Sequence, residues 1–153
     1  MKILGIGNAI VDVICKVEDD FLKNNELTKS TMKLIFDESE FQKLLSDLKI
    51  EKTVSGGSVA NSIVGLSQLQ NKVGFIGKVC DDDLGSKYEE GLKKENVEYF
   101  YSKKKEMLPT GTCLILITPD SERTMCTYLG TAGKINENDV DINAVKNSEI
   151  IFL

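Results

Sequence analysis

The stretch that decides the fold covers residues 55–66 and reads "SGGSVANSIVGL". Gly56 and Gly57 stand directly before an apolar run with helical spacing, where a helix usually has a capping side chain. Glycine there forgoes part of the stabilisation from a cap, typically about 1 kcal/mol, but lets a ligand approach the backbone. The first-turn N–H groups and Asn61, one turn in, suit hydroxyls or a phosphate. The residues equally allow a tight strand-to-helix turn in which Asn61 only satisfies a loop.

Predicted helices and strands alternate on both sides of this stretch. Apolar residues at i, i+3, i+4 and i+7 predict a helix over 38–49, with Asp37 as its N-cap. Pro119 is well placed to open a turn between two alternating segments, which predicts a β-hairpin. The other expected elements are a buried helix after the glycines, helices over 83–95 and, weakly, 136–146, and strands over 2–6, 10–17, 32–36, 73–79, 97–101, 112–118, 123–129 and 150–153. This order predicts an α/β fold with a parallel sheet interrupted by a hairpin.

The composition is that of a globular protein with neither nucleic acid nor a membrane as a partner. The 153 residues suffice for one domain with a core, and a net charge of −5 disfavours binding to nucleic acid or anionic membranes. The basic run at 103–105 is interpreted as a solvated loop. No apolar run has the length of a membrane span, and the N-terminus lacks the pattern of a signal peptide. We therefore expect a cytoplasmic protein.

The residue types exclude several kinds of site. The chain has no histidine, which excludes a histidine-based triad, an H-E-x-x-H metal site and a histidine general base within it. "GIGNAI" at 5–10 lacks the third glycine of a dinucleotide fingerprint. The acidic run at 81–83 is interpreted as a helix cap, so no metal ligands are predicted. The four cysteines have no zinc-site spacing and are expected to be buried, reduced thiols: Cys15, Cys80, Cys113 and Cys126.

Four stretches cover essentially the whole chain and share one resemblance. "GGSVANSIVGLSQLQNKVGFIGKVCDDDLG" at 56–85 combines G-G-x-x-x-N, a helix, a strand and a D-D-x-x-G loop. It looks like the N-terminal signature of the PfkB (ribokinase-like) carbohydrate and nucleoside kinases. "GIGNAIVDVI" at 5–14, "PTGTCLILITPDSERTM" at 109–125 and "TYLGTA" at 127–132 resemble the adenosine kinase-like members. Cys80 departs from the pattern, since many members have glycine there, but this puts no catalytic position in doubt.

The resemblance implies a fold and a substrate site. The fold is a doubly wound α/β domain with a mostly parallel sheet and a small β lid, whose strands we expect within 10–36 and 110–130. In this pattern the carboxylate and amide hold the sugar hydroxyls, and the glycines let the sugar lie against the backbone. The implied substrate-binding residues are Asn8, Asp12, Gly56, Gly57, Ser58 and Asn61. From the alternation of its strand alone, Asp12 could instead face water.

Arg123 follows the predicted hairpin turn. In the adenosine kinase-like pattern this arginine reaches the transferring phosphate as the lid closes, where a fixed cation stabilises developing charge. The alternation of the strand equally allows a solvated turn residue.

The resemblance also implies parts that the sequence lacks. Members of the family carry their catalytic base in a later glycine-rich motif ending in Asp, with the ATP pocket beyond it. The nearest analogue, "TAGK" at 131–134, has no Asp. The apolar run at 150–153 starts a strand and stops. We therefore expect residues 1–153 to be the N-terminal part of a single ribokinase-like domain, truncated at Leu153, and to be inactive and poorly soluble alone.

The expected activity is the ATP- and Mg²⁺-dependent phosphorylation of a primary hydroxyl of a ribose-containing nucleoside such as adenosine. A kinase of a free sugar such as ribose or fructose is the close alternative. A non-catalytic protein that binds sugars or nucleosides is the alternative from another class. The expected partner is a small-molecule substrate, and the protein is expected to be a monomer or a lid-mediated homodimer. The substrate stays open, because base specificity rests on lid side chains that the sequence does not place.

Overall fold

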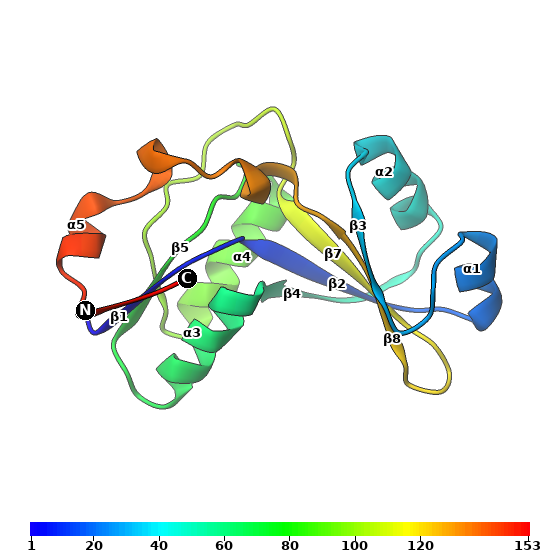
Figure 1. Ribbon diagram of the computed structural model, residues 1–153, viewed down its shortest axis with the longest axis horizontal. Coiled ribbons are helices and arrows are strands. Elements are labelled where there is room, and N and C mark those ends of the chain that lie inside the picture. Colours follow the sequence, from blue (N-terminus) through cyan, green and yellow to red (C-terminus); the bar gives the residue numbers. More distant parts are fainter.

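A computed structural model describes all 153 residues and contains two β-sheets that lie side by side (Figure 1). The first sheet has four strands in the order β6–β5–β1–β9, and every neighbouring pair is parallel. Its strands are β1 (Ile3–Ile6), β5 (Val73–Ile76), β6 (Glu98–Tyr99) and β9 (Ile150–Phe152). The predicted α/β fold with a mostly parallel sheet is therefore confirmed.

Helices cover both faces of this first sheet. The helices α3 (Ser58–Gln68) and α4 (Asp83–Lys94) cover one face, over the main hydrophobic core. On the other face, α5 (Ile142–Lys146) covers a small cluster of Leu4, Ile76 and Ala144. Two 3₁₀ helices, η1 (Gly130–Lys134) and η2 (Glu137–Asp139), precede α5. The sheet is thus doubly wound, as predicted.

Two glycines of the "GIGNAI" motif let α3 lie directly on β1. A Cβ placed on Gly5 would come within 2.5 Å of Cγ1 of Ile63, and one placed on Gly7 within 2.9 Å of Cβ of Val59. Real Cβ atoms do not approach this closely, so larger residues would push the helix away from the strand. The close packing brings the first turn of α3 beside the end of β1.

The second sheet has five strands in the order β3–β8–β7–β2–β4. They are β2 (Ile10–Lys16), β3 (Met32–Ile35), β4 (Ile50–Gly56), β7 (Gly111–Ile117) and β8 (Arg123–Tyr128). The predicted hairpin is present as the antiparallel pair β7–β8, while β2 pairs in parallel with β7 and antiparallel with β4. Four of the strands lie within 10–36 and 110–130, and β4 lies outside both segments.

One face of the second sheet is buried, and the other is largely open except where Ile10 and Cys113 pack against Ala132 of η1. The helices α1 (Asp19–Asn24) and α2 (Glu38–Ser46) lie over the buried face, where Phe41 stacks on Tyr128 with ring centroids 5.4 Å apart. The side chain of Asp37 accepts a hydrogen bond from the N–H of Glu40 at 2.9 Å, which confirms the predicted cap of α2. The open face carries the half-exposed side chain of Asp12.

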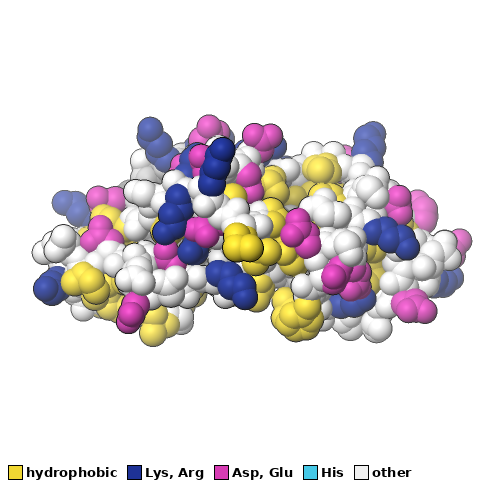
Figure 2. Space-filling model, turned by 90° about the horizontal axis from the view of Figure 1, so that it is seen from above, with side chains coloured by type: hydrophobic (Ala, Val, Ile, Leu, Met, Phe, Trp, Pro, Cys, Tyr) yellow, Lys and Arg dark blue, Asp and Glu magenta, His cyan; other side chains and the backbone are white.

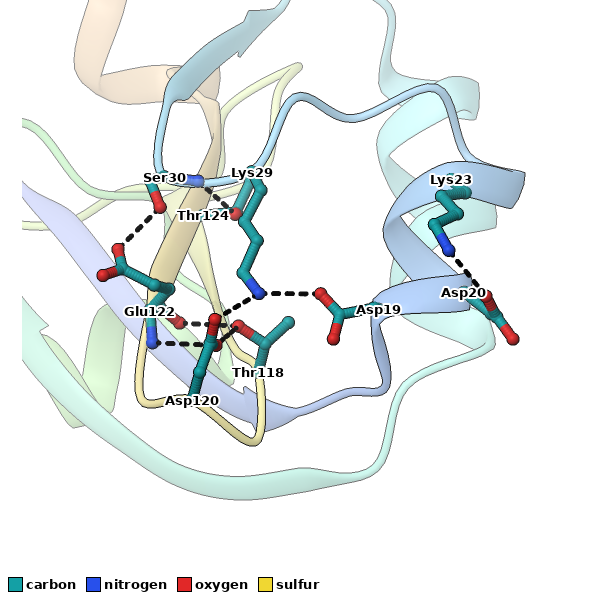
Figure 3. A network of polar contacts seen from close by, with 9 residues as sticks. All are labelled: Asp19, Asp20, Lys23, Lys29, Ser30, Thr118, Asp120, Glu122 and Thr124. Carbon is teal, nitrogen blue, oxygen red and sulfur yellow. Dashed lines mark hydrogen bonds and ion pairs between the residues drawn. The ribbon is translucent and has the colours of Figure 1, made fainter.

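A network of ion pairs lies at the end of the second sheet that carries the β7–β8 turn (Figure 3). Lys29 donates to Asp19 at 2.7 Å and to Asp120 at 2.5 Å, which joins the loop between α1 and β3 to the β7–β8 turn. Hydrogen bonds from Lys29 and Thr118 lower the pKa of Asp120 to about 2. The turn that precedes Arg123 is therefore held by the loop between α1 and β3.

Asp82 joins α4 to the start of the second sheet. Its carboxylate accepts from the N–H of Gly85 at 2.7 Å, which confirms the predicted helix cap. It also accepts from the hydroxyl of Thr110 at 2.7 Å and from the N–H of Thr110 at 2.9 Å. Thr110 is 1% exposed and directly precedes β7. One carboxylate therefore fixes the start of β7 against the start of α4.

Several local predictions are corrected by the structure. The edge strand β4 was not predicted, α1 forms in a stretch left unassigned, and α2 ends at Ser46 instead of residue 49. The strand over 97–101 shrinks to Glu98–Tyr99, and the helix over 136–146 splits into η2 and α5. All four cysteines are buried and free, as expected. No helix combines the length and the apolar character that crossing a membrane requires.

Candidate functional site

The centre of the candidate site is the turn at Gly56 and Gly57, between β4 and α3. Gly57 is the N-cap of α3, and no side chain caps the helix there. Its φ of +100° lies in a region that other residues rarely adopt, and a Cβ there would overlap the carbonyl oxygen of Asn8. The N–H of Asn61 donates to the carbonyl of Gly57 at 2.8 Å, which closes the first turn of α3. The glycine is therefore required by both backbone conformation and space.

The carboxylate of Asp12 lies directly against this turn. Asp12 is on β2, and its neighbour strand β4 ends at Gly56. A Cβ placed on Gly56 would overlap the carboxylate, coming within 2.5 Å of its Cγ. Gly56, the first glycine of the pair, thus makes room for an acidic side chain, while Gly57 allows the backbone to bend.

The carboxylate of Asp12 has no partner inside the protein. It accepts no side-chain or backbone hydrogen bond and forms no ion pair, although its side chain is half-buried. Burial therefore raises its pKa, and its charge adds to the effect of burial in raising the pKa of the Cys113 thiol. The half-buried carboxylate therefore has only solvent as a hydrogen-bond partner, and ligand hydroxyls would supply donors to it.

The remaining polar residues predicted for the site surround the same turn. Asn8, Ser58 and Asn61 are exposed, and neither asparagine side chain makes a hydrogen bond. Asn61 lines an open cleft of about 630 Å³ between β4, α3 and α4, and Asp12 does not line this cleft. The structure therefore gathers all six predicted residues around one turn, but shows no direct contact between the Asp12 carboxylate and the Asn61 amide.

A row of side chains crosses the open face of the second sheet from Asp12 to an apolar hollow. In register, Asp12 pairs with Cys113, Cys113 with Thr127, and Thr127 with Leu34. These residues share one face, and three strand spacings give about 14 Å from end to end. Leu34 lines a hollow of about 300 Å³ with Phe36, and its other lining residues are Ile35, Leu108, Tyr128, Leu129, Gly130, Gly133 and Lys134. Sequence patterns did not identify this row, because it depends on strand register.

Arg123 lies on the same open face but apart from Asp12. It is the first residue of β8, is exposed, and forms no ion pair. Arg123 lies four positions before Thr127 of the Asp12 row, which is about 13 Å along the strand. The structure therefore does not bring Arg123 to the turn, and a contact with a ligand there requires movement of the sheet.

No group of three or more His, Cys, Asp or Glu side chains is arranged to hold a metal ion. The acidic run at 81–83 instead supplies Asp82 as the cap of α4.

Replacing Gly56 by alanine in the full-length protein is expected to lower stability by roughly 1–3 kcal/mol, because the new methyl group overlaps the Asp12 carboxylate. Urea unfolding measures this loss. In an Asp12→Ala background the same change should cost much less, since the obstructing group is gone. Gly65→Ala, within α3 and with nothing near its Cβ position, is the control and should be neutral or stabilising. Equal costs in both backgrounds would contradict the contact.

Both the sequence and the structure resemble those of known kinases. The sequence is 27% identical over 140 residues to a 5-dehydro-2-deoxygluconokinase from Mesomycoplasma hyopneumoniae strain 232, which covers 90% of this chain and 40% of the relative. The structure resembles adenosine kinase from Sinorhizobium meliloti, with a TM-score of 0.88, 33% identity, and coverage of 98% of this chain and 46% of the other. It also resembles a probable sugar kinase from Rhizobium etli CFN 42, with a TM-score of 0.88, 34% identity, and coverage of 98% and 45%.

These likenesses confirm the ribokinase-like fold that the sequence predicted. The chain spans less than half the length of each of these relatives. The pattern of the pfkB family carbohydrate kinases matches residues 3–153. Because the match extends over nearly every residue, the chain belongs to the pfkB family of carbohydrate kinases.

Proposed function

We propose that the full-length protein transfers the γ-phosphate of ATP to a primary hydroxyl of a ribose-containing nucleoside, as an adenosine kinase does. Residues 1–153 would supply the sugar site and a lid formed by the second sheet. The observation that carries this proposal is the row from Asp12 to Leu34, with an unpaired carboxylate at one end and an apolar hollow at the other. A nucleoside likewise has polar hydroxyls on its ribose at one end and an apolar ring face on its base at the other.

At the polar end, Asp12 would accept hydrogen bonds from two neighbouring ribose hydroxyls. Hydrogen bonds to a charged group contribute roughly 1.5–3 kcal/mol each, which explains the retention of a carboxylate in a half-buried place. The N–H of Gly57 makes no backbone hydrogen bond within the protein and lies at the N-terminus of α3, where N–H groups are donors for a ligand. Asn61 would bond one of the same hydroxyls, with Asn8 and Ser58 nearby.

At the apolar end, the open face suits a base better than it suits a free sugar. In the next row, Ile14 and Ile115 are half-buried and Met125 is exposed, and Ile115 packs against the cluster of Ile10, Cys113 and Ala132. Seen from above the view of Figure 1, hydrophobic side chains gather near the middle of the molecule between charged ones (Figure 2). A nucleobase buries apolar surface there, whereas a free sugar brings only more hydroxyls.

Two alternatives stay with this proposal. A probable sugar kinase is as similar in structure as an adenosine kinase, so phosphorylation of a free sugar such as ribose or fructose is the second candidate. A non-catalytic protein that binds sugars or nucleosides is the candidate from another class. The unpaired Asp12 carboxylate suits all three, and the apolar hollow favours the nucleoside kinase.

The kinase family implies ATP as the phosphate donor. The proposal places the catalytic base and most of the ATP site outside residues 1–153, and residues 1–153 within one ribokinase-like domain. Mg²⁺ is expected with ATP and would neutralise charge on the phosphates, but no residue described here is assigned to it. This chain contributes the positioning of the acceptor, on which phosphoryl transfer largely depends. We also propose that the protein is cytoplasmic and that it is a monomer or a lid-mediated homodimer.

A ligand screen on the full-length protein tests the proposed substrate. Adenosine is expected to raise the melting temperature more than ribose or fructose at equal concentration, since a ligand at 100 times its Kd adds about 2.7 kcal/mol of stability. Phosphate transfer from ATP to adenosine is then measured directly. Stronger stabilisation and faster turnover with ribose or fructose would select the sugar kinase. Binding without any phosphate transfer would select the non-catalytic protein.

A further inference from the structure

Tyr88 contacts the Gly56–Gly57 turn from inside the protein. It lies on α4, its side chain is 0% exposed, and its hydroxyl donates to the carbonyl oxygen of Gly56 at 3.3 Å. One turn further along α4, a Cβ placed on Gly91 would come within 3.1 Å of Cβ of Ser55. The helix therefore packs closely on the end of β4 and holds Tyr88 behind the turn.

The ring of Tyr88 is fixed by other aromatic rings. It packs against Phe75 and Tyr99, with ring centroids 6.3 and 6.0 Å away. Burial raises the pKa of Tyr88 far above its ordinary value, and the nearby charge of Asp12 adds to the effect. The hydroxyl therefore stays protonated at physiological pH and remains a donor to Gly56.

The hydrogen bond from Tyr88 orients a peptide group that has a second polar end. The carbonyl of Gly56 and the N–H of Gly57 belong to one planar trans peptide and point in opposite directions. Because the carbonyl is directed inward to Tyr88, the N–H is directed outward. This N–H donates no hydrogen bond within the protein, and the unpaired Asp12 carboxylate lies against the same turn.

We propose that Tyr88 is a positioning residue of the sugar site: its hydroxyl holds the Gly56–Gly57 peptide so that the N–H of Gly57 meets a substrate hydroxyl beside Asp12. The inference rests on the function proposed above and adds a residue that does not touch the substrate. A hydrogen bond made equally to bound substrate and transition state changes KM and leaves kcat unchanged.

The test variant is Tyr88→Phe in the full-length protein, which removes the hydroxyl and keeps the ring. The KM for adenosine is expected to rise about three- to tenfold with kcat unchanged, in the range of one net hydrogen bond. Tyr99→Phe is the matched control, because its hydroxyl donates to the Gly77 carbonyl at 2.5 Å within the same aromatic cluster. Its KM is expected to stay at the wild-type value.

The amide resonance of Gly57 gives a readout that does not depend on substrate. It is expected to shift in Tyr88→Phe and to stay in place in Tyr99→Phe. An unchanged KM and resonance in Tyr88→Phe would overturn the inference and leave the proposed function standing. A rise in KM shared by both variants would reflect loss of packing and would also overturn it. Wild-type protein that binds neither adenosine nor free sugars would overturn the proposed function instead, and the resonance would still decide whether Tyr88 sets the peptide.

Discussion

The Arg123→Ala variant of the full-length protein is expected to lose about a hundredfold or more in kcat, with a much smaller rise in the KM for adenosine. We propose that this arginine reaches the transferring phosphate once the second sheet has closed, and removal of one fixed charge-stabilising group typically costs 10²–10³ in kcat. Arg123 forms no ion pair, and the Lys29 network holds the turn beside it. Steady-state kinetics with adenosine and ATP measure both constants.

The control for Arg123 lies in the same row of the second sheet. Lys16 on β2 and Arg123 on β8 both pair with Ile117 of β7, and both are exposed cations. Lys16→Ala removes the same charge from the protein and should leave kcat unchanged. Wild-type kcat in Arg123→Ala would show that the arginine is a solvated turn residue. An equal loss in both variants would assign the effect to general charge and not to one contact.

The Asp12→Asn variant is expected to bind the nucleoside about ten- to a hundredfold more weakly. It keeps the shape of the side chain but removes the charge, which costs roughly 1.5–3 kcal/mol in hydrogen bonding to the sugar. Titration calorimetry with adenosine measures the loss. A deoxy analogue that lacks one of the two hydroxyls should bind the wild type weakly and should lose much less on the change to asparagine. Asp20→Asn, at an exposed side chain of α1, is the control with an equal change of charge.

The stability of Asp12→Asn separates a ligand contact from a structural residue. Burial raises the pKa of Asp12 in the folded state above its unfolded value, so the ionised carboxylate lowers stability at neutral pH. Relative to asparagine, this cost is absent below the unfolded pKa and is complete once the pH has risen through the folded pKa. Asp12→Asn should therefore be as stable as the wild type or more stable at neutral pH. Marked destabilisation, or unchanged affinity, would contradict a role in sugar binding.

The sequence revealed most strands and helices of both sheets, because their residues follow simple periodicities. The apolar spacing of α2 and the alternation of β2, with Val11 and Val13 buried, were correctly interpreted. The sequence pattern did not predict the edge strand β4, because both of its faces are largely exposed and its apolar residues do not alternate with polar ones. Only the β-branched residues Ile50, Thr53 and Val54 pointed to a strand there.

The sequence predicted the candidate site only at the glycines, because glycine has few structural uses before a helix. Two glycines before a helix indicate close approach of some group, and the structure shows the groups to be the Asp12 carboxylate and the Asn8 carbonyl. The contact from Tyr88 was not predictable, because the spacing of α4 marks that position simply as apolar and buried. Likewise, the row from Asp12 to Leu34 depends on the register of four strands, which the turn residues alone did not determine.

The Asp82 carboxylate gives the molecule a mechanical linkage. Since it caps α4 and accepts hydrogen bonds from Thr110 in front of β7, a shift of the second sheet relative to the first would be transmitted to the first turn of the helix. The same helix carries Tyr88, less than two turns further on, against the carbonyl of Gly56. Closure of the sheet would thus act on the Gly56–Gly57 turn from inside the protein, through Tyr88, while the ligand acts on it from outside. Both forces meet at a single peptide group, so tightening of the turn and closure of the sheet would be one concerted movement.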